Sequence, residues 1–189
     1  SQQFKKFLFI GKRRNIELNE MISFKNNWKT QLIKVLQKQG REKPVGNSSE
    51  FFVFPKGIDF DMPDFAIGRL YWDSWLIYRA RFLRIPVIDA TPSLLYLHQI
   101  HDYSHHKKGF KGVWYGEEAQ KNFILSGGTQ NRFKVTDADY WLTSTTGVQK
   151  TSVTIRSFIR NLRVLGIINP RLNFLIFPIY VVLLGIFKA

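Results

Sequence analysis

The chain has 189 residues, enough for one domain with a sizeable core and too few for two full ones. Hydrophobic residues make up 44% and aromatic residues 15%, so disorder throughout is excluded. The 28 lysines and arginines outnumber the 14 acidic residues and give a net charge of +14. This charge favours a phosphate-bearing partner, of which there are three kinds to consider: nucleic acid, anionic lipid and a nucleotide sugar. The absence of cysteine excludes disulfides, zinc fingers and cysteine nucleophiles, and it fits a reducing, cytoplasmic compartment.

The first third of the chain predicts a strand, a helix and a second strand. Residues 7–10 form an apolar run between basic clusters, too short for the core of a signal peptide, and predict a strand. Ser23 is the predicted N-cap of a helix over residues 24–39. One apolar stripe at helical spacing runs along that helix and comprises Trp28, Leu32, Val35 and Leu36. A polar loop separates it from a predicted strand at residues 51–55.

The middle of the chain alternates helix and strand. We expect a largely buried helix from Gly68 or Arg69 to Leu83, then a strand at residues 85–91. A polar loop follows in which all four histidines fall within nine positions. A short helix over residues 117–126, stopped by two glycines, precedes a last strand near residue 140. Together these elements predict an α/β domain over residues 1–150.

Residues 151–189 form a distinct C-terminal segment. Residues 153–168 predict a basic amphipathic helix, and Leu172 to Phe187 carry no charge. Because a spanning helix normally needs about 20 residues, we favour an interfacial or re-entrant membrane anchor, followed by a marginal spanning segment and then by a buried core helix. The chain shows no recognisable nucleic-acid-binding module, so we expect a membrane surface and no nucleic acid as partner.

The predicted helix at residues 68–83 carries the first candidate site. Arg69 and Asp73 are four residues apart, so the guanidinium is expected to keep the carboxylate ionised or to meet a diphosphate beside it. Trp72 and Trp75 flank that face with indole rings of the kind that stack on sugars, and a carboxylate between them could accept a proton from an attacking hydroxyl. The alternative is a core helix with two buried tryptophans and an exposed ion pair.

Five segments occur in a fixed order: FFVFPKG, FAIGRLYWDSWLIYRAR, IPVIDAT, HQIHDYSHH and GVWYGEEAQKNFILSGG. Together they resemble a bacterial and viral family of glycosyltransferase-like proteins whose pattern is similar to FAIGR, WDNWL, VIDAT, HQNHDYSH and W-x-G-x-E-A-x-x-N. The resemblance covers residues 51–128 and, more weakly, the first strand. The chain departs from the pattern at Tyr71, where the family has a smaller residue, and at Ser74 and Ile100, where it has asparagine.

The resemblance implies a partial GT-A-like α/β fold that presents the acceptor side of a glycosyltransferase. By analogy Asp73 is the general base that deprotonates the acceptor hydroxyl, as in an inverting enzyme, and Arg69 stabilises the departing diphosphate of a nucleotide sugar. The acceptor is expected to be a glycan or a lipid-linked molecule. The donor-binding half, with its Asp-x-Asp metal motif, is expected upstream of Ser1 or on a partner chain. The alternative is a non-catalytic, membrane-anchored subunit of a larger assembly, built on a degenerate copy of the fold.

The histidine-rich segment is the expected source of a metal ligand, because enzymes with this fold often take one from a histidine beyond the catalytic acid. His101 and then His98 are the candidates for Mn²⁺ or Mg²⁺, with Asp102 orienting one imidazole beside the substrate. His105 is expected to face solvent or to contact a substrate phosphate. The competing interpretation is a polar loop whose histidines are structural or solvent-facing.

Two Asp-x-Asp triplets occur in the chain, at residues 59–61 and 137–139. Neither precedes the base candidate at the end of a predicted strand, where a donor motif belongs. We therefore expect turn or capping carboxylates at both places.

Overall fold

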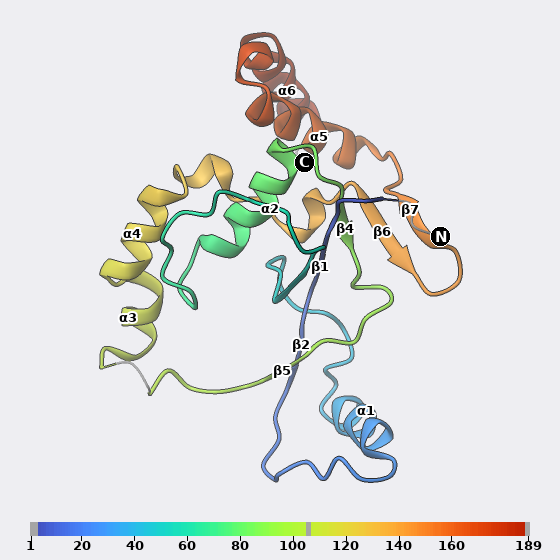
Figure 1. Cartoon of the computed structure of the whole chain (residues 1–189). Coiled ribbons are helices and arrows are strands. Elements are labelled where there is room, and N and C mark those ends of the chain that lie inside the picture. The colour runs from blue at the N-terminus through green and yellow to red at the C-terminus, as the bar shows by residue number, and fades with distance from the viewer. Residues whose placement is uncertain (1–3, 105–106, 188–189) are drawn as a thin grey trace.

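The computed structural model describes residues 4–104 and 107–187 and has a mixed α/β fold (Figure 1). Its main sheet has the strand order β3-β1-β4-β6-β7, in which β1, β4 and β6 are parallel while β3 and β7 are antiparallel to their neighbours. The strands are β1 (Leu8–Gly11), β3 (Phe51–Val53), β4 (Val87–Asp89), β6 (Tyr140–Thr143) and β7 (Gly147–Lys150). The predicted strands at residues 7–10, 51–55 and 85–91 are therefore confirmed, each within a residue or two of its ends.

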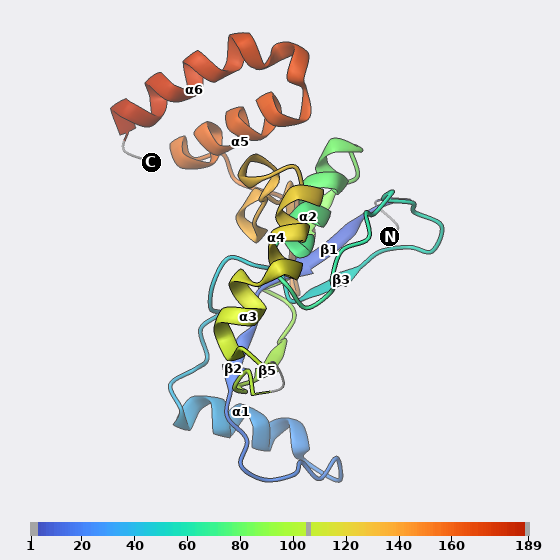
Figure 2. The same cartoon turned by 90° about the vertical axis from the view of Figure 1, so that its left-hand side faces the viewer.

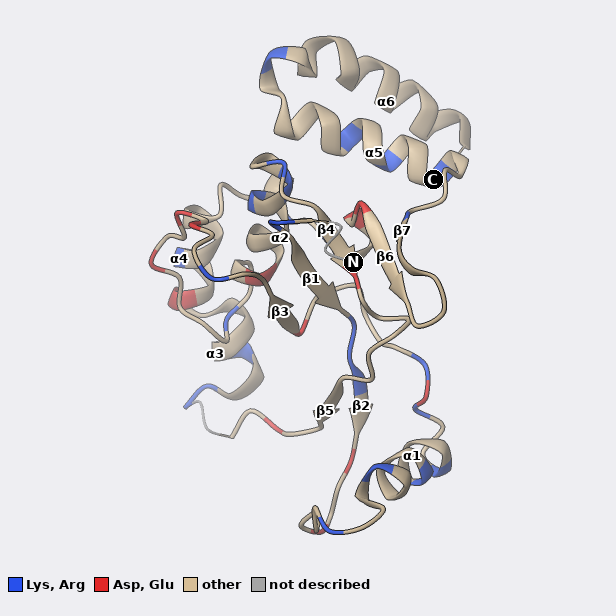
Figure 3. Ribbon diagram, turned by 45° about the vertical axis from the view of Figure 1, so that its right-hand side comes forward, with Lys and Arg blue, Asp and Glu red and all other residues tan. Residues whose placement is uncertain are grey.

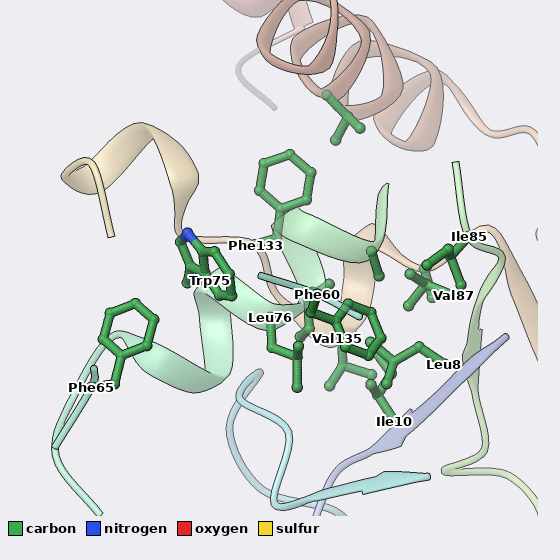
Figure 4. Close-up of a cluster of buried hydrophobic side chains, with 14 residues drawn as sticks. Leu8, Ile10, Phe60, Phe65, Trp75, Leu76, Ile85, Val87, Phe133 and Val135 are labelled. Atoms are coloured by element: carbon green, nitrogen blue, oxygen red, sulfur yellow. The ribbon is translucent and has the colours of Figure 1, made fainter. Parts of the chain in front are cut away.

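The main core lies where helix α2 (Trp72–Phe82) packs against β1 and β4. Apolar side chains of the two strands, which include Leu8, Ile10 and Val87, are fully buried beneath the helix (Figure 4). Phe133 and Val135 close the cluster from the segment that leads into β6. Alternate buried positions in β1 explain why this short apolar run forms a strand with a buried face.

A smaller unit extends from the main sheet. Strand β2 (Arg14–Ile16) follows β1 almost directly and pairs in parallel with β5 (Leu97–Gln99). Helix α1 (Trp28–Lys38) covers this pair with the predicted stripe, of which Leu32 and Leu36 are buried against Ile16. The helix begins at Trp28 and not after Ser23, because Asn27 adopts a left-handed conformation (φ 66°) that interrupts helical hydrogen bonding.

Helices α3 (Gly109–Tyr115) and α4 (Glu117–Leu125) lie beside α2. The sequence predicted α4 but not α3. The two helices meet at Gly116, where a Cβ atom would stand 2.3 Å from the carbonyl oxygen of Gly112, so the close turn requires glycine. Three single-turn 3₁₀ helices complete the fold: η1 (Thr129–Asn131), η2 (Val135–Asp137) and η3 (Pro170–Leu172).

The C-terminal segment is a helical hairpin of α5 (Ile155–Ile168) and α6 (Asn173–Phe187). Helix α5 packs on the domain through Val164, which belongs to the main core, and through an ion pair of 3.4 Å between Arg160 and Asp137. Helix α6 runs back along α5 (Figure 2). By length and composition, residues 170–187 are apolar enough to cross a membrane, and only 6% of that window is buried.

Charge is distributed unevenly between the two helices of the hairpin. Arginines lie along α5, whereas α6 carries no charged residue (Figure 3). The predicted basic helix followed by an uncharged helix is therefore confirmed, and Pro178 lies inside α6 without ending it.

Candidate functional site

A cavity of about 440 Å³ gathers most of the residues predicted to form the site. It lies where the chain leaves β1 and where it enters β3, which is antiparallel to β1, so both segments meet at the carboxyl end of β1. Ligands of open α/β sheets commonly bind outside the carboxyl ends of the parallel strands. The lining residues come from five segments of the chain: Arg13, residues 48–50, residues 68–70 with Trp72 and Asp73, His98 with His101 and Tyr103, and Val113 with Trp114.

Helix α2 begins at Trp72, three or four residues later than the predicted start at Gly68 or Arg69. Gly68 and Tyr71 have positive φ angles of 83° and 85°, and these turns keep the preceding loop out of the helix. Arg69 and Asp73 therefore do not share a helical face, which corrects that expectation. They nevertheless both line the cavity, Arg69 from the loop and Asp73 from the first turn of α2.

The carboxyl of Asp73 lies in a poorly solvated position. Burial raises its pKa above the ordinary value of 3.8, and the nearby charge of Glu50 acts in the same direction. A backbone hydrogen bond from Ser74 and the charge of Arg132 lower the pKa but do not cancel the effect of burial. Asp73 is thus a carboxylate with increased basicity facing a cavity.

Arg69 is held by a different partner from the one expected. Its Nε lies 2.6 Å from Oε2 of Glu118 on α4, so the structure places the guanidinium on Glu118 and not on Asp73. The pair spans the motifs FAIGR and W-x-G-x-E-A-x-x-N. This contact keeps a cation in the cavity wall, and among the described residues no ion pair engages the carboxylate of Asp73.

The two tryptophans of α2 have different positions. Trp72 lines the cavity and packs against Phe52, with 5.3 Å between ring centroids. Trp75 is only 6% exposed, and its ring lies 5.3 Å from that of Phe65 in the main core. The structure therefore gives Trp75 a packing role and does not place it where it would contact a ligand of the cavity, which corrects its predicted place in the site.

Sequence reasoning did not assign Arg13 and Glu50, which form an ion pair of 2.6 Å in the cavity wall. His98 lies beside them, with its Nδ1 3.9 Å from Oε2 of Glu50. Glu50 directly precedes the FFVFPKG segment, and Arg13 follows the first strand, so their closeness depends on the antiparallel pairing of β1 with β3. Nothing local in the sequence indicates that pairing.

Trp114 was also not assigned a role, although its motif was recognised. Its indole lines the cavity from α3 and stacks on Phe110, with 5.2 Å between ring centroids. The cavity thus has indole walls from Trp72 and Trp114 rather than from the two tryptophans of α2.

His98 and His101 both line the cavity, with 5.4 Å between their ring centroids. His98 is on strand β5 and not in a loop, and burial together with the charge of Arg13 lowers its pKa, which favours the neutral imidazole. Nδ1 of His101 lies 2.8 Å from the carbonyl oxygen of Asp102. The carboxylate of Asp102 accepts hydrogen bonds from the N–H and hydroxyl of Ser104. His105 lies outside the described residues.

The described residues do not assemble a metal centre. Within residues 4–104 and 107–187, no group of three or more histidine, aspartate or glutamate side chains is placed to hold a metal ion. Two imidazoles and one carboxylate already paired with Arg13 do not fit the ligand set of Mn²⁺ or Mg²⁺.

Asn122 connects α4 to the loop that carries Arg69. Its side chain is fully buried, and its amide donates to the carbonyl oxygens of Ala66 (2.9 Å) and Leu70 (3.0 Å). Its carbonyl oxygen accepts from the N–H of Ala66 at 2.9 Å. The asparagine that ends W-x-G-x-E-A-x-x-N therefore fixes the loop of FAIGR, which explains why two distant segments form one wall.

One carboxylate of each Asp-x-Asp triplet has the predicted turn or capping role, Asp59 in the first and Asp137 in the second, whereas Asp61 and Asp139 make ion pairs with Arg79 and Arg81. Asp59 accepts a hydrogen bond from the N–H of Asp61, and Asp61 pairs with Arg79. Asp137 accepts from the N–H of Lys134, and Asp139 accepts from the N–H of Val87. None of these carboxylates lines the cavity.

No protein-family model, no curated protein and no solved structure matches the chain. A function for the cavity is therefore inferred from the residues that line it.

Proposed function

We propose that this chain provides the acceptor site and the general base of a nucleotide-sugar glycosyltransferase with a GT-A-like fold. The observation that carries the proposal is Asp73, a half-buried carboxyl with a raised pKa at the wall of a cavity that Arg69 and Trp72 also line. A carboxylate is a weak base at its ordinary pKa, and a raised pKa increases its ability to take a proton at neutral pH.

In the proposed reaction an acceptor hydroxyl transfers its proton to the carboxylate of Asp73. The hydroxyl oxygen attacks the anomeric carbon of the donor as the bond from that carbon to the diphosphate breaks, and the diphosphate leaves with the bonding electrons. Arg69 and Arg13 are paired with Glu118 and Glu50, and the N–H groups of their guanidinium ions that these pairs do not use would donate to the departing anion. Trp72 and Trp114 offer flat apolar faces for the acceptor ring.

The nucleotide-sugar donor and its divalent metal belong to a half of the enzyme that we expect from sequence outside these residues or from a partner chain. The parallel strands β1, β4 and β6, with the cavity at the carboxyl end of β1, support a GT-A-like assignment. A half-buried carboxyl that lines a cavity and makes no ion pair among the described residues supports the enzyme over a non-catalytic subunit of a larger assembly, which would not need it.

We further propose that the α5–α6 hairpin attaches the protein to a membrane surface at its interface. Helix α5 is fixed to the domain through Val164 and the Arg160–Asp137 pair, and α6 lies along it. Such a hairpin would bury its α6 face in the bilayer without crossing it, while the arginines of α5 meet lipid phosphates. The side of the membrane is expected to be the cytoplasmic one.

The test is sugar transfer by the complete protein from a panel of nucleotide-sugar donors, for the wild type and Asp73→Asn. We expect the substitution to reduce turnover by at least about a hundredfold, since general-base catalysis contributes at least that much. Asp61→Asn is the matched control, because Asp61 is exposed and lies outside the cavity. Unchanged turnover in Asp73→Asn would eliminate Asp73 as the base, and absence of transfer in the wild type would favour the non-catalytic subunit.

A further inference from the structure

A second hollow lies next to the cavity that contains Asp73. Its volume is about 210 Å³, and its wall is largely aromatic: Tyr71, Trp114, Tyr115, Ala119, Gln120 and Phe123. Nothing in the proposed transfer reaction requires this hollow.

The cavity and the hollow lie side by side because they share lining residues or residues adjacent in the chain. Trp114 lines both of them, and the consecutive residues Tyr71 and Trp72 face one each. Tyr71 adopts a φ of 85°, a conformation that a bulky side chain rarely takes, and this turn directs its ring away from the cavity that Trp72 lines. The cavity and the hollow are therefore adjacent across Trp114.

Among the aromatic rings that line the hollow, Tyr71 is packed against neighbouring side chains, whereas Tyr115 is exposed to solvent. Tyr71 packs edge-on against Phe123, with 5.3 Å between centroids, and the guanidinium of Arg132 lies 5.0 Å from the centre of the Tyr71 ring. Tyr115 is 66% exposed. Fixed aromatic faces with an exposed tyrosine form a platform that needs no rearrangement to bind a flat partner.

Gln120 adds the polar part of the hollow. Its Nε2 donates one hydrogen bond to the carbonyl oxygen of Tyr115 at 3.3 Å, and the amide has a second N–H and a carbonyl oxygen that can pair with hydroxyl groups. The described residues that line the hollow are all uncharged, and the guanidinium of Arg132 lies on the ring of Tyr71, so the wall itself offers a phosphate or a metal ion no charged ligand. Aromatic faces with a neutral amide suit a ring that has one apolar face and a rim of hydroxyls.

We propose that the hollow is a subsite for a second sugar ring, so that the acceptor is an oligosaccharide that crosses Trp114 and not a single sugar or a lipid alcohol. This inference rests on the proposed function, because it identifies the acceptor of the same site. The ring that receives the new sugar lies beside Asp73, and the next ring of the acceptor lies on Tyr71, Tyr115 and Phe123.

The experiment measures binding and does not depend on transfer. Glucose and N-acetylglucosamine, with their β-1,4-linked oligomers of increasing length, are titrated into the full chain and followed by calorimetry. We expect the disaccharide of at least one series to bind about tenfold more tightly than its monosaccharide, with smaller gains for longer oligomers. In Tyr115→Ala the disaccharide should lose that gain while the monosaccharide keeps its affinity.

Ile124→Ala is the matched control, because Ile124 is a 77% exposed residue of the same helical region outside both spaces. Farnesol is titrated as the competing lipid alcohol. The subsite is refuted if affinity does not rise from one ring to two, if Tyr115→Ala weakens both sugars equally, or if farnesol displaces the disaccharide in the wild type but not in Tyr115→Ala. Any of these results leaves the Asp73 transfer test unaffected, and unchanged transfer in Asp73→Asn leaves the binding result standing.

Discussion

Replacing Asn122 by alanine should loosen one wall of the cavity at a cost that follows from its hydrogen bonds. The change removes three hydrogen bonds to the loop that carries Arg69, each of 2.9–3.0 Å. A net contribution of about 1 kcal/mol for each bond gives about 3 kcal/mol. Because Ala66 and Leu70 are only half-buried, water can satisfy part of what they lose, so we expect a decrease of about 2–3 kcal/mol in the free energy of unfolding.

The assay is unfolding in guanidinium chloride, followed by tryptophan fluorescence, with amide hydrogen exchange over residues 66–70 as a local readout. Lys121→Ala is the control, since Lys121 is exposed on the same helix and should change stability by no more than about 0.5 kcal/mol. A loss below about 1 kcal/mol in Asn122→Ala, or unchanged exchange in the loop, would refute the reasoning that this side chain fixes the loop.

Three further predictions follow from the described contacts. Burial raises the pKa of Asp73, so the folded state binds its proton more tightly than the unfolded state, and this contribution to stability is present below about pH 4 and lost as the pH rises through the folded pKa. In Asp73→Asn the free energy of unfolding should therefore fall less steeply between pH 4 and neutrality than in the wild type. An unchanged slope in denaturation experiments across this pH range would contradict the prediction. Gly116→Ala should destabilise the protein by about 1–3 kcal/mol, because the new Cβ would meet the carbonyl oxygen of Gly112, and an unchanged denaturation midpoint would show that the α3–α4 turn adjusts freely. Val182→Asp, at a 59% exposed position of α6, should reduce flotation with anionic lipid vesicles severalfold, whereas Ile124→Asp should not; equal binding of both variants would argue against α6 as the contact with lipid.

Elements with a strong local pattern were predictable from the sequence. The apolar runs of β1, β3 and β4 and the periodic stripes of α1 and α5 identify their own secondary structure, because burial of one face determines it. Short elements such as β2, β5 and α3 carry no such pattern. Strands β2 and β5 form because their parallel pairing, Arg14–Ile16 with Leu97–Gln99, satisfies their backbone hydrogen bonds. Helix α3 depends on its packing against α4.

The sequence predicted which residues line the candidate site better than it predicted which residues contact one another there. Asp73, Arg69 and Trp72 line one cavity as predicted, but not from one helical face, and Arg69 pairs with Glu118, which is 49 positions away in the chain. The early turn at Tyr71 also could not be anticipated, since a positive φ at an aromatic residue has no sequence signature. Contacts between distant segments depend on the fold as a whole, and a helical repeat alone does not contain them.

The attachment of α5 to the domain has a consequence for how the protein would search for its acceptor. A flexible linker would let the domain tumble above a membrane, whereas Val164 and the Arg160–Asp137 pair join the hairpin to the core without one. Diffusion would then be confined to two dimensions with a single orientation, and the α1 unit, at the opposite end of the molecule from α6, would point away from the bilayer (Figures 1 and 2). The height of the cavity above the lipid headgroups would be constant, so acceptor chains would be selected partly by how far their ends reach from the surface.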